Sequence, residues 1–481
     1  MSRILTIDQG TTSSRSIIFD INGDIEQVAQ EEYPLIFPND GWVEIDPDAL
    51  YKSVTNTLNQ LDLEGVKFGG ITNQRETTII WDKNTLEPIY NAIVWQDRRT
   101  SEYCSELATD HNKSTVKEKT GLLIDSYFSA TKIKWILDNV DGARARAEAG
   151  ELCFGTVDTY LMYRLSAGKL FKTDITNASR TMLFNINTLR WDDELLKLFD
   201  IPKLLLPEVV HSDSCFGSLS ELGDITIHAV LGDQQAALFG QGCLEKGQLK
   251  STYGTGCFIM SNVGDKPIHS DDGLLTTIGF SLNGKVFYAI EGSIYASGTT
   301  VQWLRDNLQF FDKSDQSETY LNEDGNANNV LFIPAFTGLG APYWNSKIRA
   351  SFHGITRDTS RSDLINAAFN SVTYQTKDII DCLIRSGIKI ESLNVDGGMV
   401  ANKKFVKQIA NLLNIEVSVP ENSESTARGV AVLAGVASKT FDLELISNQK
   451  RASTHPDIAA HDFMVKDYEN WKGLIAKLLS P

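Results

Sequence analysis

A polar turn between two short apolar runs occurs near the start of the chain and again near its middle. The first turn occupies residues 8–15, with apolar runs at 4–7 and 17–19, and the second lies within residues 250–260. Short runs rich in β-branched and aromatic residues favour strands, and a glycine between them favours a tight turn. A hairpin repeated in this way predicts two similar α/β domains that face a common ligand cleft.

The first turn has the side chains needed to hold a phosphate group. Gly10 lets a ligand approach the backbone closely, and the hydroxyl groups of the next four residues can donate to phosphate oxygens. Arg15 adds a planar, positively charged guanidinium group, and Asp8 can hold a metal ion through water. This stretch by itself leaves a plain polar hairpin turn open as the alternative.

Each half of the chain also contains a strand that ends in a polar turn and leads into a helix. Asp233 follows one such run, where a carboxylate can accept a hydroxyl proton, although a helix N-cap uses the same residue type. Gly397 and Gly398 follow the other, where a helix N-terminus suits an adenosine phosphate, although a tight turn also explains the pair. We place the boundary near residues 241 and 242, which gives domains 1–241 and 242–481.

Four further residues have the chemistry of a polyol pocket. Arg75 and Glu76 offer a donor and an acceptor matched to neighbouring hydroxyl groups. Trp95 and Phe258 would supply apolar walls for the carbon edge of such a ligand. Adjacent charges are more commonly a surface ion pair, however, and single aromatic residues more commonly belong to the core.

Composition and missing motifs exclude several classes of function. The formal net charge is −17, so nucleic acid and anionic membranes are poor partners, and no apolar stretch approaches the roughly 18 residues of a membrane helix. Six cysteines lie far apart without a Cys-x-x-Cys pair, which indicates reduced thiols, no structural zinc and a cytoplasmic protein. The P-loop, the protein-kinase catalytic loop and the dinucleotide-binding glycine motif are missing, so paired hairpins would have to hold any nucleotide.

Motifs spread from residue 4 to about residue 435 resemble those of one known family. They are DQGTTSSR, GITNQRETTI, NAIVWQDRRT, GLLIDSYFSATKIKWILDN, DITNASRTMLFNI, GDQQAALFGQ, STYGTGCF, FTGLGAPYW and VDGGMVAN. In this order they are similar to the FGGY carbohydrate kinases, within the actin, hexokinase and heat-shock-chaperone superfamily. Several of them are typical of the glycerol kinase branch.

The resemblance implies two ribonuclease H-like domains that close over ATP and glycerol and make sn-glycerol 3-phosphate and ADP, a step of glycerol catabolism. It implies that Asp233 is the general base and that Asp8 is the acid on the magnesium side. The implied glycerol-binding residues are Arg75, Glu76, Trp95, Tyr127, Asp233, Gln234 and Phe258. The implied nucleotide-binding residues are Thr11, Thr12, Ser13, Arg15, Thr255, Gly298, Gln302, Gly398 and Asn402.

The same resemblance implies ATP and Mg²⁺ as cofactors, and we expect a homo-oligomer, either a dimer or a tetramer. A kinase for another polyol or a ketose is the alternative within the family. An actin-like or chaperone-like ATPase module is the alternative from another class, but it would not need a hydroxyl pocket with a base. Residues 221–224 replace the glycine-rich, Arg-bearing loop with which some bacterial members bind an inhibitory sugar phosphate, so that regulation is doubtful here.

Overall fold

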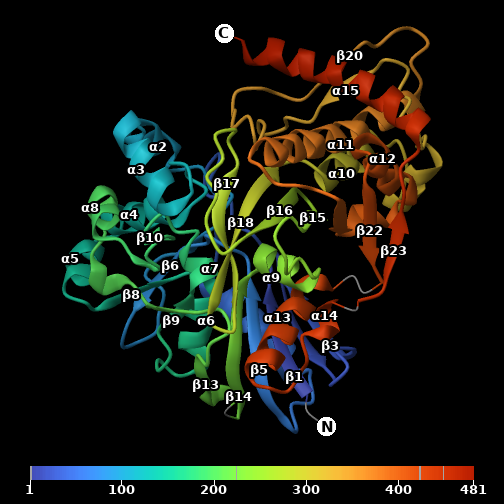
Figure 1. The fold of residues 1–481 in the computed structure, drawn as a ribbon. Helices are drawn as coiled ribbons and strands as arrows, with labels where there is room; N and C mark the ends of the chain where they lie inside the picture. The colour runs from blue at the N-terminus through green and yellow to red at the C-terminus, as the bar shows by residue number, and fades with distance from the viewer. Residues whose placement is uncertain (1–2, 224, 422–423, 448, 481) are drawn as a thin grey trace.

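A computed structural model of the protein describes residues 3–223, 225–421, 424–447 and 449–480, which form two mixed sheets, one above the other in Figure 1. The first sheet contains, in spatial order, β13 (Gly217–Leu219), β14 (Ile225–Gly232), β5 (Val66–Asn73), β1 (Arg3–Gln9), β2 (Ser13–Phe19) and β3 (Ile25–Glu32). The second contains β17 (Leu275–Leu282), β18 (Lys285–Ile294), β16 (Cys257–Gly264), β15 (Leu249–Tyr253), β21 (Ser392–Asp396), β22 (Glu416–Pro420) and β23 (Arg451–Thr454).

The centres of the two sheets share one strand order. In the first sheet, β1, β2 and β3 are antiparallel, while β1 runs parallel to β5 and β5 runs parallel to β14. In the second, β15, β16 and β18 are antiparallel, while β15 runs parallel to β21 and β21 runs parallel to β22. The predicted α/β class and the repeated hairpin are therefore confirmed.

Helices cover both sheets, and short strands complete the connections. The longer helices are α1 (Pro47–Asn59), α2 (Ser101–Leu107), α3 (Asp110–Thr120), α4 (Ser129–Asn139), α5 (Ala143–Glu148), α6 (Val157–Leu165), α8 (Asp193–Phe199), α9 (Asp233–Gly240), α10 (Gly298–Asp306), α11 (Arg361–Arg385), α12 (Lys403–Leu413), α13 (Ser425–Ala437) and α15 (Ile458–Leu479). The short elements are β4 (Glu44–Ile45), β6 (Ile79–Asp82), β7 (Ala92–Ile93), β8 (Leu152–Gly155), β9 (Lys172–Asp174), α7 (Ile175–Ala178), β10 (Phe184–Asn185), β11 (Arg190–Trp191), β12 (Glu208–Val210), β19 (Leu331–Ile333), β20 (Ser351–His353) and α14 (Glu444–Ser447). None of the helices in the described ranges is both long and apolar enough to cross a membrane.

Helix α13 packs against the first sheet although its sequence follows most of the second. Figure 1 shows it beside β5 and β1, and Thr6 Oγ1 donates to the carbonyl of Ala427 at 3.4 Å. A Cβ on Gly70 of β5 would stand 2.9 Å from Val430 Cγ2, and a Cβ on Gly429 would clash with the backbone of α9. Glycines therefore let α13 lie close to both β5 and α9, the helix that begins with Asp233.

The β17–β18 hairpin joins the second sheet to the first half of the chain. The Thr276 amide donates to the carbonyl of Gly121 at 2.9 Å, and the Tyr288 hydroxyl donates to the carbonyl of Ile186 at 2.8 Å. Gly121 has a φ of +73°, and a Cβ there would clash with Thr276. Glycine is therefore required where the hairpin meets the end of α3.

A buried polar network supports the strands that lead to the predicted site. Asp158 of α6 accepts from the hydroxyl groups of Thr156 at 2.5 Å and Thr173 at 2.7 Å. The next residue after Thr173, Asp174, caps α7, and the Thr176 hydroxyl of that helix accepts from the Gly232 amide at 2.9 Å. The pKa of Asp158 is raised to about 7: burial is the main cause, the Asp174 carboxylate contributes to the rise, and the two hydroxyls oppose it.

We expect Asp158 to make the protein less stable as the pH rises. Its carboxyl binds a proton more tightly in the native state than in the unfolded chain, so stability falls between its ordinary pKa of 3.8 and its native pKa of about 7. Asp158→Asn should remove this dependence, so its free energy of unfolding should decline less than the parent's from pH 4 to pH 7. Urea unfolding at several pH values tests this, and parallel curves would contradict it.

Two segments differ from the expectations for them. Gly398 opens a short 3-10 turn, η4 (Gly398–Ala401), and α12 begins only after Asn402, whose side chain caps it. Residues 313–329 form a polar stretch for which the sequence alone predicts a surface loop, and most of them are exposed, but they also contain the 3-10 helix η3 (Ser314–Thr319), and their carbonyl groups accept from buried amide side chains of α11 and α12. Sequence polarity predicted the exposure of this segment but does not reveal its long-range hydrogen bonds.

Candidate active site

Arg75 and Glu76 follow the end of β5 and are buried, with exposed fractions of 3% and 1%. The alternative of a surface ion pair is therefore wrong. The Arg75 Nε lies 3.3 Å from Asp233 Oδ1, and its Nη2 donates to the Tyr127 hydroxyl at 3.4 Å. The structure thus brings together four of the predicted hydroxyl ligands, from β5, α9 and the segment before α4.

Glu76 occupies an unusual backbone conformation. Its φ is +62°, and the Thr77 amide donates to the Arg75 carbonyl across it at 2.7 Å, which makes a very tight turn. Left-handed backbone is unfavourable for a residue with a long side chain and is frequent at functional sites. Its carboxylate accepts from Arg180 Nε at 2.6 Å, and its pKa is raised by burial although Arg180 and Arg75 oppose the shift.

Asp233 is the first residue of α9, directly after β14. The N-cap position belongs to Gly232, but the Asp233 carboxylate accepts from the Gln234 amide in the first turn of the helix at 2.7 Å, so it also stabilises the start of α9. The side chain is only half-buried and lies against the guanidinium group of Arg75. A carboxylate in this position can reach a ligand and is oriented by a neighbouring cation.

Three aromatic rings meet beside this cluster. Trp95 lies 5.6 Å from Tyr127 and 6.1 Å from Phe258, measured between ring centroids. The Arg75 guanidinium stands 5.7 Å from the Phe258 ring, and the Trp95 indole donates to Thr11 Oγ1 at 3.0 Å. Trp95 therefore links the predicted polyol pocket to the predicted phosphate turn.

Gln234 is held by a buried lysine of the second sheet. Lys250 Nζ donates to Gln234 Oε1 at 2.5 Å, to Thr252 Oγ1 at 3.0 Å and to the carbonyl of Phe258 at 3.3 Å. Burial lowers the pKa of Lys250, and the carboxylates of Asp396 and Asp233 oppose that shift. With its oxygen occupied by the ammonium group, Gln234 keeps its amide hydrogens for a ligand.

The first polar turn lies next to Asp233. The Gly10 amide donates to the Ser13 carbonyl at 2.8 Å, which closes the turn and leaves Thr12 exposed. Burial raises the pKa of Asp8 to about 7; Arg15 opposes this shift, and the neighbouring Asp233 and Glu424 carboxylates add to it. Arg15 also pairs with Glu424 at 2.7 Å.

The predicted nucleotide residues of the second half lie on the β15–β16 turn, on α10, and on η4 and the start of α12. The Gly298 amide, at the start of α10, donates to the Gly254 carbonyl at 2.8 Å in the β15–β16 turn. A Cβ on Gly397 would clash with Tyr253 at the end of β15, whereas the space around Gly398 is open. Thr255, Gln302 and Gly398 are exposed, while Asn402 is buried as the cap of α12.

Sequence reasoning missed three buried charged residues of this site. Glu291 and Arg180 are both fully buried and bind Arg75 or Glu76, and Lys250 holds Gln234. Arg180 lies within the quoted motif DITNASRTMLFNI, Lys250 directly precedes the motif STYGTGCF, and Glu291 is a single acid in the otherwise mostly apolar strand β18. A charge inside a strand predicted to be buried is the signal that indicates such a residue.

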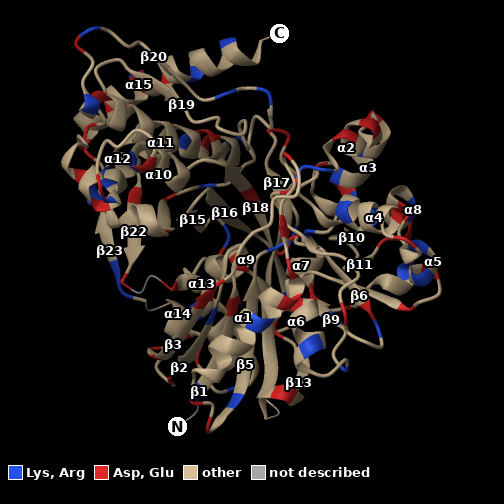
Figure 2. Ribbon diagram, turned by 180° about the vertical axis from the view of Figure 1, so that it is seen from behind, with Lys and Arg blue, Asp and Glu red and all other residues tan. Residues whose placement is uncertain are grey.

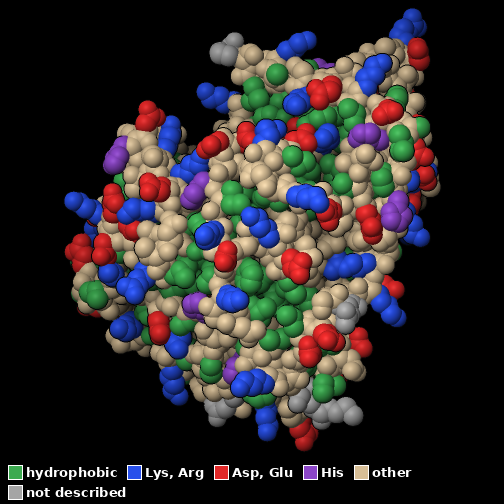
Figure 3. All heavy atoms as spheres, viewed as in Figure 1, with side chains coloured by type: hydrophobic (Ala, Val, Ile, Leu, Met, Phe, Trp, Pro, Cys, Tyr) green, Lys and Arg blue, Asp and Glu red, His purple; other side chains and the backbone are tan. Residues whose placement is uncertain are grey.

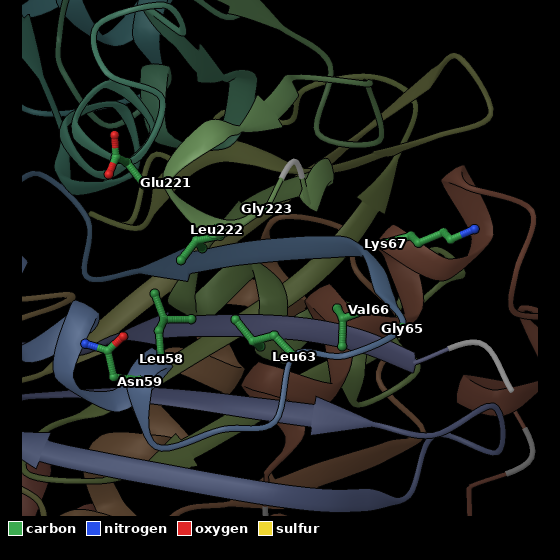
Figure 4. Close-up of a pocket in the computed structure, with 9 residues that line it drawn as sticks. All are labelled: Leu58, Asn59, Leu63, Gly65, Val66, Lys67, Glu221, Leu222 and Gly223. Atoms are coloured by element: carbon green, nitrogen blue, oxygen red, sulfur yellow. The ribbon is translucent and has the colours of Figure 1, made fainter.

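One surface cavity is separate from this site. Its volume is about 550 Å³. Figure 4 shows its lining, which includes the apolar residues Leu58, Leu63, Val66 and Leu222. It lies at the beginning of β5 and β14, whereas Arg75 and Asp233 follow the ends of those strands. It includes residues 221–223 of the stretch discussed for regulation; Asp224 lies outside the described residues.

Comparisons with known proteins agree over the whole chain. The family model for the N-terminal domain of FGGY carbohydrate kinases matches residues 3–240, and that for the C-terminal domain matches residues 249–438. A glycerol kinase of a Marinomonas species is 52% identical over 442 residues, 90% of each chain. One of Staphylococcus haemolyticus is 48% identical over 486 residues, 98% of this chain and 97% of its own length.

A solved structure gives the same result. The crystal structure of Plasmodium falciparum glycerol kinase with ADP matches with a TM-score of 0.91 at 35% identity, covering 100% of this chain and 99% of that one. Both family models and the full-length relatives therefore agree with the fold and with the motifs. The chain belongs to the FGGY family of carbohydrate kinases.

Proposed function

We infer that the protein is a glycerol kinase, which transfers the γ-phosphoryl group of ATP to glycerol and forms sn-glycerol 3-phosphate and ADP. The observation that carries this inference is the buried Arg75, which faces the Asp233 carboxylate on one side and the Phe258 ring on the other. A donor, a base and an apolar wall at one point suit a small polyol. Glycerol kinases about 50% identical over most of the chain support the same substrate.

The residues divide into two groups with distinct roles. In the first, Arg75, Glu76, Tyr127 and Gln234 bind the hydroxyl groups of glycerol, Trp95 and Phe258 line its carbon edge, and Asp233 accepts the proton as the oxygen attacks phosphorus. In the second, Thr11, Thr12, Ser13, Arg15, Thr255, Gly298, Gln302, Gly398 and Asn402 bind the nucleotide. Positioning and neutralisation of charge account for most of the rate enhancement in phosphoryl transfer.

Mg²⁺ fits the chemistry around Asp8. Asp8 and Asp233 influence each other electrostatically, and carboxylate oxygens are the protein ligands that Mg²⁺ prefers. No cluster of three or more His, Cys, Asp or Glu residues suited to a metal occurs among the described residues, which agrees with an ion held mainly by phosphate and water. We propose that Asp8 holds the ion, which neutralises phosphate charge when bound.

A cytoplasmic location and a homo-oligomer, either a dimer or a tetramer, complete the proposal. In Figures 2 and 3 acidic and basic side chains are interspersed, which gives little support to a nucleic-acid partner. The described cysteines are all free thiols, as suits a reducing compartment. Light scattering coupled to size-exclusion chromatography measures the oligomeric state.

We expect glycerol to be preferred over propanediols and over five-carbon ketoses. A diol that lacks one hydroxyl leaves a buried partner such as Arg75 without its hydrogen bond, a loss of about 1–3 kcal/mol. The measurement is ADP release with ATP and Mg²⁺ for glycerol, both propanediols, dihydroxyacetone, xylulose and ribulose. A higher kcat/KM for a pentulose would assign the chain to another branch of the family.

A further inference from the structure

Glu291 is an acidic residue of the second sheet whose side chain contacts Arg75, a residue of the proposed glycerol pocket in the first half of the chain. It belongs to β18, and its side chain has no exposure to solvent. Neighbouring contacts fix the hairpin there: the Ser179 and Thr277 hydroxyls lie 3.0 Å apart, and the Gln235 amide donates to the carbonyl of Ile278 at 3.2 Å. Glu291 therefore reaches Arg75 from the opposite domain of the family models.

Its carboxylate is shared between two arginines. Arg75 Nη1 donates to Glu291 Oε2 at 2.5 Å and Arg75 Nη2 to Oε1 at 3.3 Å. Arg180 Nη2 donates to Oε1 at 2.9 Å, and Arg180 Nε donates to Glu76 at 2.6 Å. Two arginines and two carboxylates thus alternate in one buried network, and both guanidinium groups have a fixed orientation.

Burial alone would raise the pKa of Glu291, but the guanidinium groups of Arg180 and Arg75 outweigh it and lower the pKa to about 2. The carboxylate therefore stays ionised at neutral pH. Because Glu291 occupies Nη1 and Nη2 of Arg75, the guanidinium cannot turn, and its Nε faces Asp233 at 3.3 Å. Glu291 thus orients the Arg75 guanidinium from behind, without itself being exposed to the pocket.

We propose that Glu291 is a positioning residue for glycerol: it fixes the Arg75 guanidinium from the C-terminal domain, with Arg180 holding the second oxygen. The inference rests on the proposed function, because Arg75 is taken there as a glycerol ligand. It makes glycerol binding depend on the packing of the β17–β18 hairpin. Loss of the Glu291 charge then weakens glycerol binding more than it affects ATP.

The test is the variant Glu291→Gln, which keeps the shape of the side chain and removes its charge. With saturating ATP we expect the KM for glycerol to rise about 10- to 100-fold, the KM for ATP to stay within about twofold, and kcat to fall less than KM rises. Calorimetric titration with glycerol should show the same loss of affinity. A variant that folds like the parent but keeps its glycerol KM, or loses only kcat, would overturn the proposal.

Asp378→Asn is the matched control. Asp378 is a buried carboxylate of α11 that accepts from the hydroxyls of Tyr343 at 2.7 Å and Tyr468 at 2.6 Å, so its loss also breaks a buried polar network. We expect its glycerol KM to match the parent's; a rise equal to that of Glu291→Gln would show that any such break weakens the pocket, and would overturn the proposal.

Arg180→Lys gives a second measurement if Glu291→Gln does not fold. It keeps the positive charge but cannot span Glu76 and Glu291 together, so the same rise in glycerol KM is expected and its absence overturns the proposal. The activity of the unsubstituted parent distinguishes failure of the proposed function from failure of the proposed role of Glu291. A parent inactive on glycerol refutes the proposed function and with it this role, whereas an active parent with an unchanged KM in the variant that folds refutes this role alone.

Discussion

Asp233→Asn should lower kcat for glycerol phosphorylation by about 10²–10⁴-fold, the usual contribution of a positioned general base. A hydroxyl group is a poor nucleophile at neutral pH, and Asp233 is half-buried beside Arg75 at the start of α9. Asparagine keeps the shape and an acceptor for the Arg75 Nε, but it cannot take the proton. Affinity for ATP, measured by calorimetry, should change little.

Asp213→Asn provides the comparison for this variant. Asp213 is also half-buried, and it accepts from the Ser281 hydroxyl at 2.6 Å and the Asn283 amide at 2.7 Å, at the β17–β18 hairpin and away from the pocket. Its kcat should match that of the parent. If Asp233→Asn also keeps kcat within a few-fold of the parent, Asp233 is a simple ligand and another group must accept the proton.

Arg75→Ala should reduce the free energy of unfolding by about 3 kcal/mol, in addition to abolishing tight glycerol binding, because it removes one partner of a buried ion pair. Glu291 is fully buried and keeps only Arg180 at 2.9 Å when Arg75 is absent. Urea unfolding followed by circular dichroism measures the loss. Adding Glu291→Gln to Arg75→Ala should restore part of the stability, because the buried side chain at position 291 then carries no charge that lacks a partner.

The exposed pair Arg385–Asp272 gives the corresponding surface control. Its atoms lie 2.9 Å apart, but the side chains are 53% and 37% exposed, so Arg385→Ala should lose less than about 1 kcal/mol. An equal loss for Arg75→Ala and Arg385→Ala would mean that the buried network contributes no more than a surface pair. If the double variant Arg75→Ala, Glu291→Gln regains none of the lost free energy of unfolding, the unpaired Glu291 charge is not the cause of the loss.

The local parts of the site could be predicted from the sequence because each has a short-range signal. Glycine and hydroxyl residues between two strands indicated both turns, and Asp233 at a strand end indicated a ligand position. The family motifs supplied the roles of Tyr127 and Gln234, which spacing alone did not.

The long-range parts could not be predicted in the same way. Arg75 and Glu291 are 216 residues apart, and no local pattern tells which carboxylate a buried arginine will meet. The boundary at residues 241 and 242 assigns α13 to the second half, yet this helix lies on the first sheet. Hydrophobic periodicity shows that a helix has a buried face, but not which sheet covers it.

The return of α13 to the first sheet also constrains how the chain acquires its structure during synthesis. Strands β1 and β5 leave the ribosome several hundred residues before the helix that covers them, so the nascent chain exposes Gly70 and its apolar neighbours for most of translation. Such non-local pairing slows folding and leaves apolar surface open to aggregation. The N-terminal half released alone would lack this helix. The apolar face of its sheet would then stay uncovered and available to chaperones.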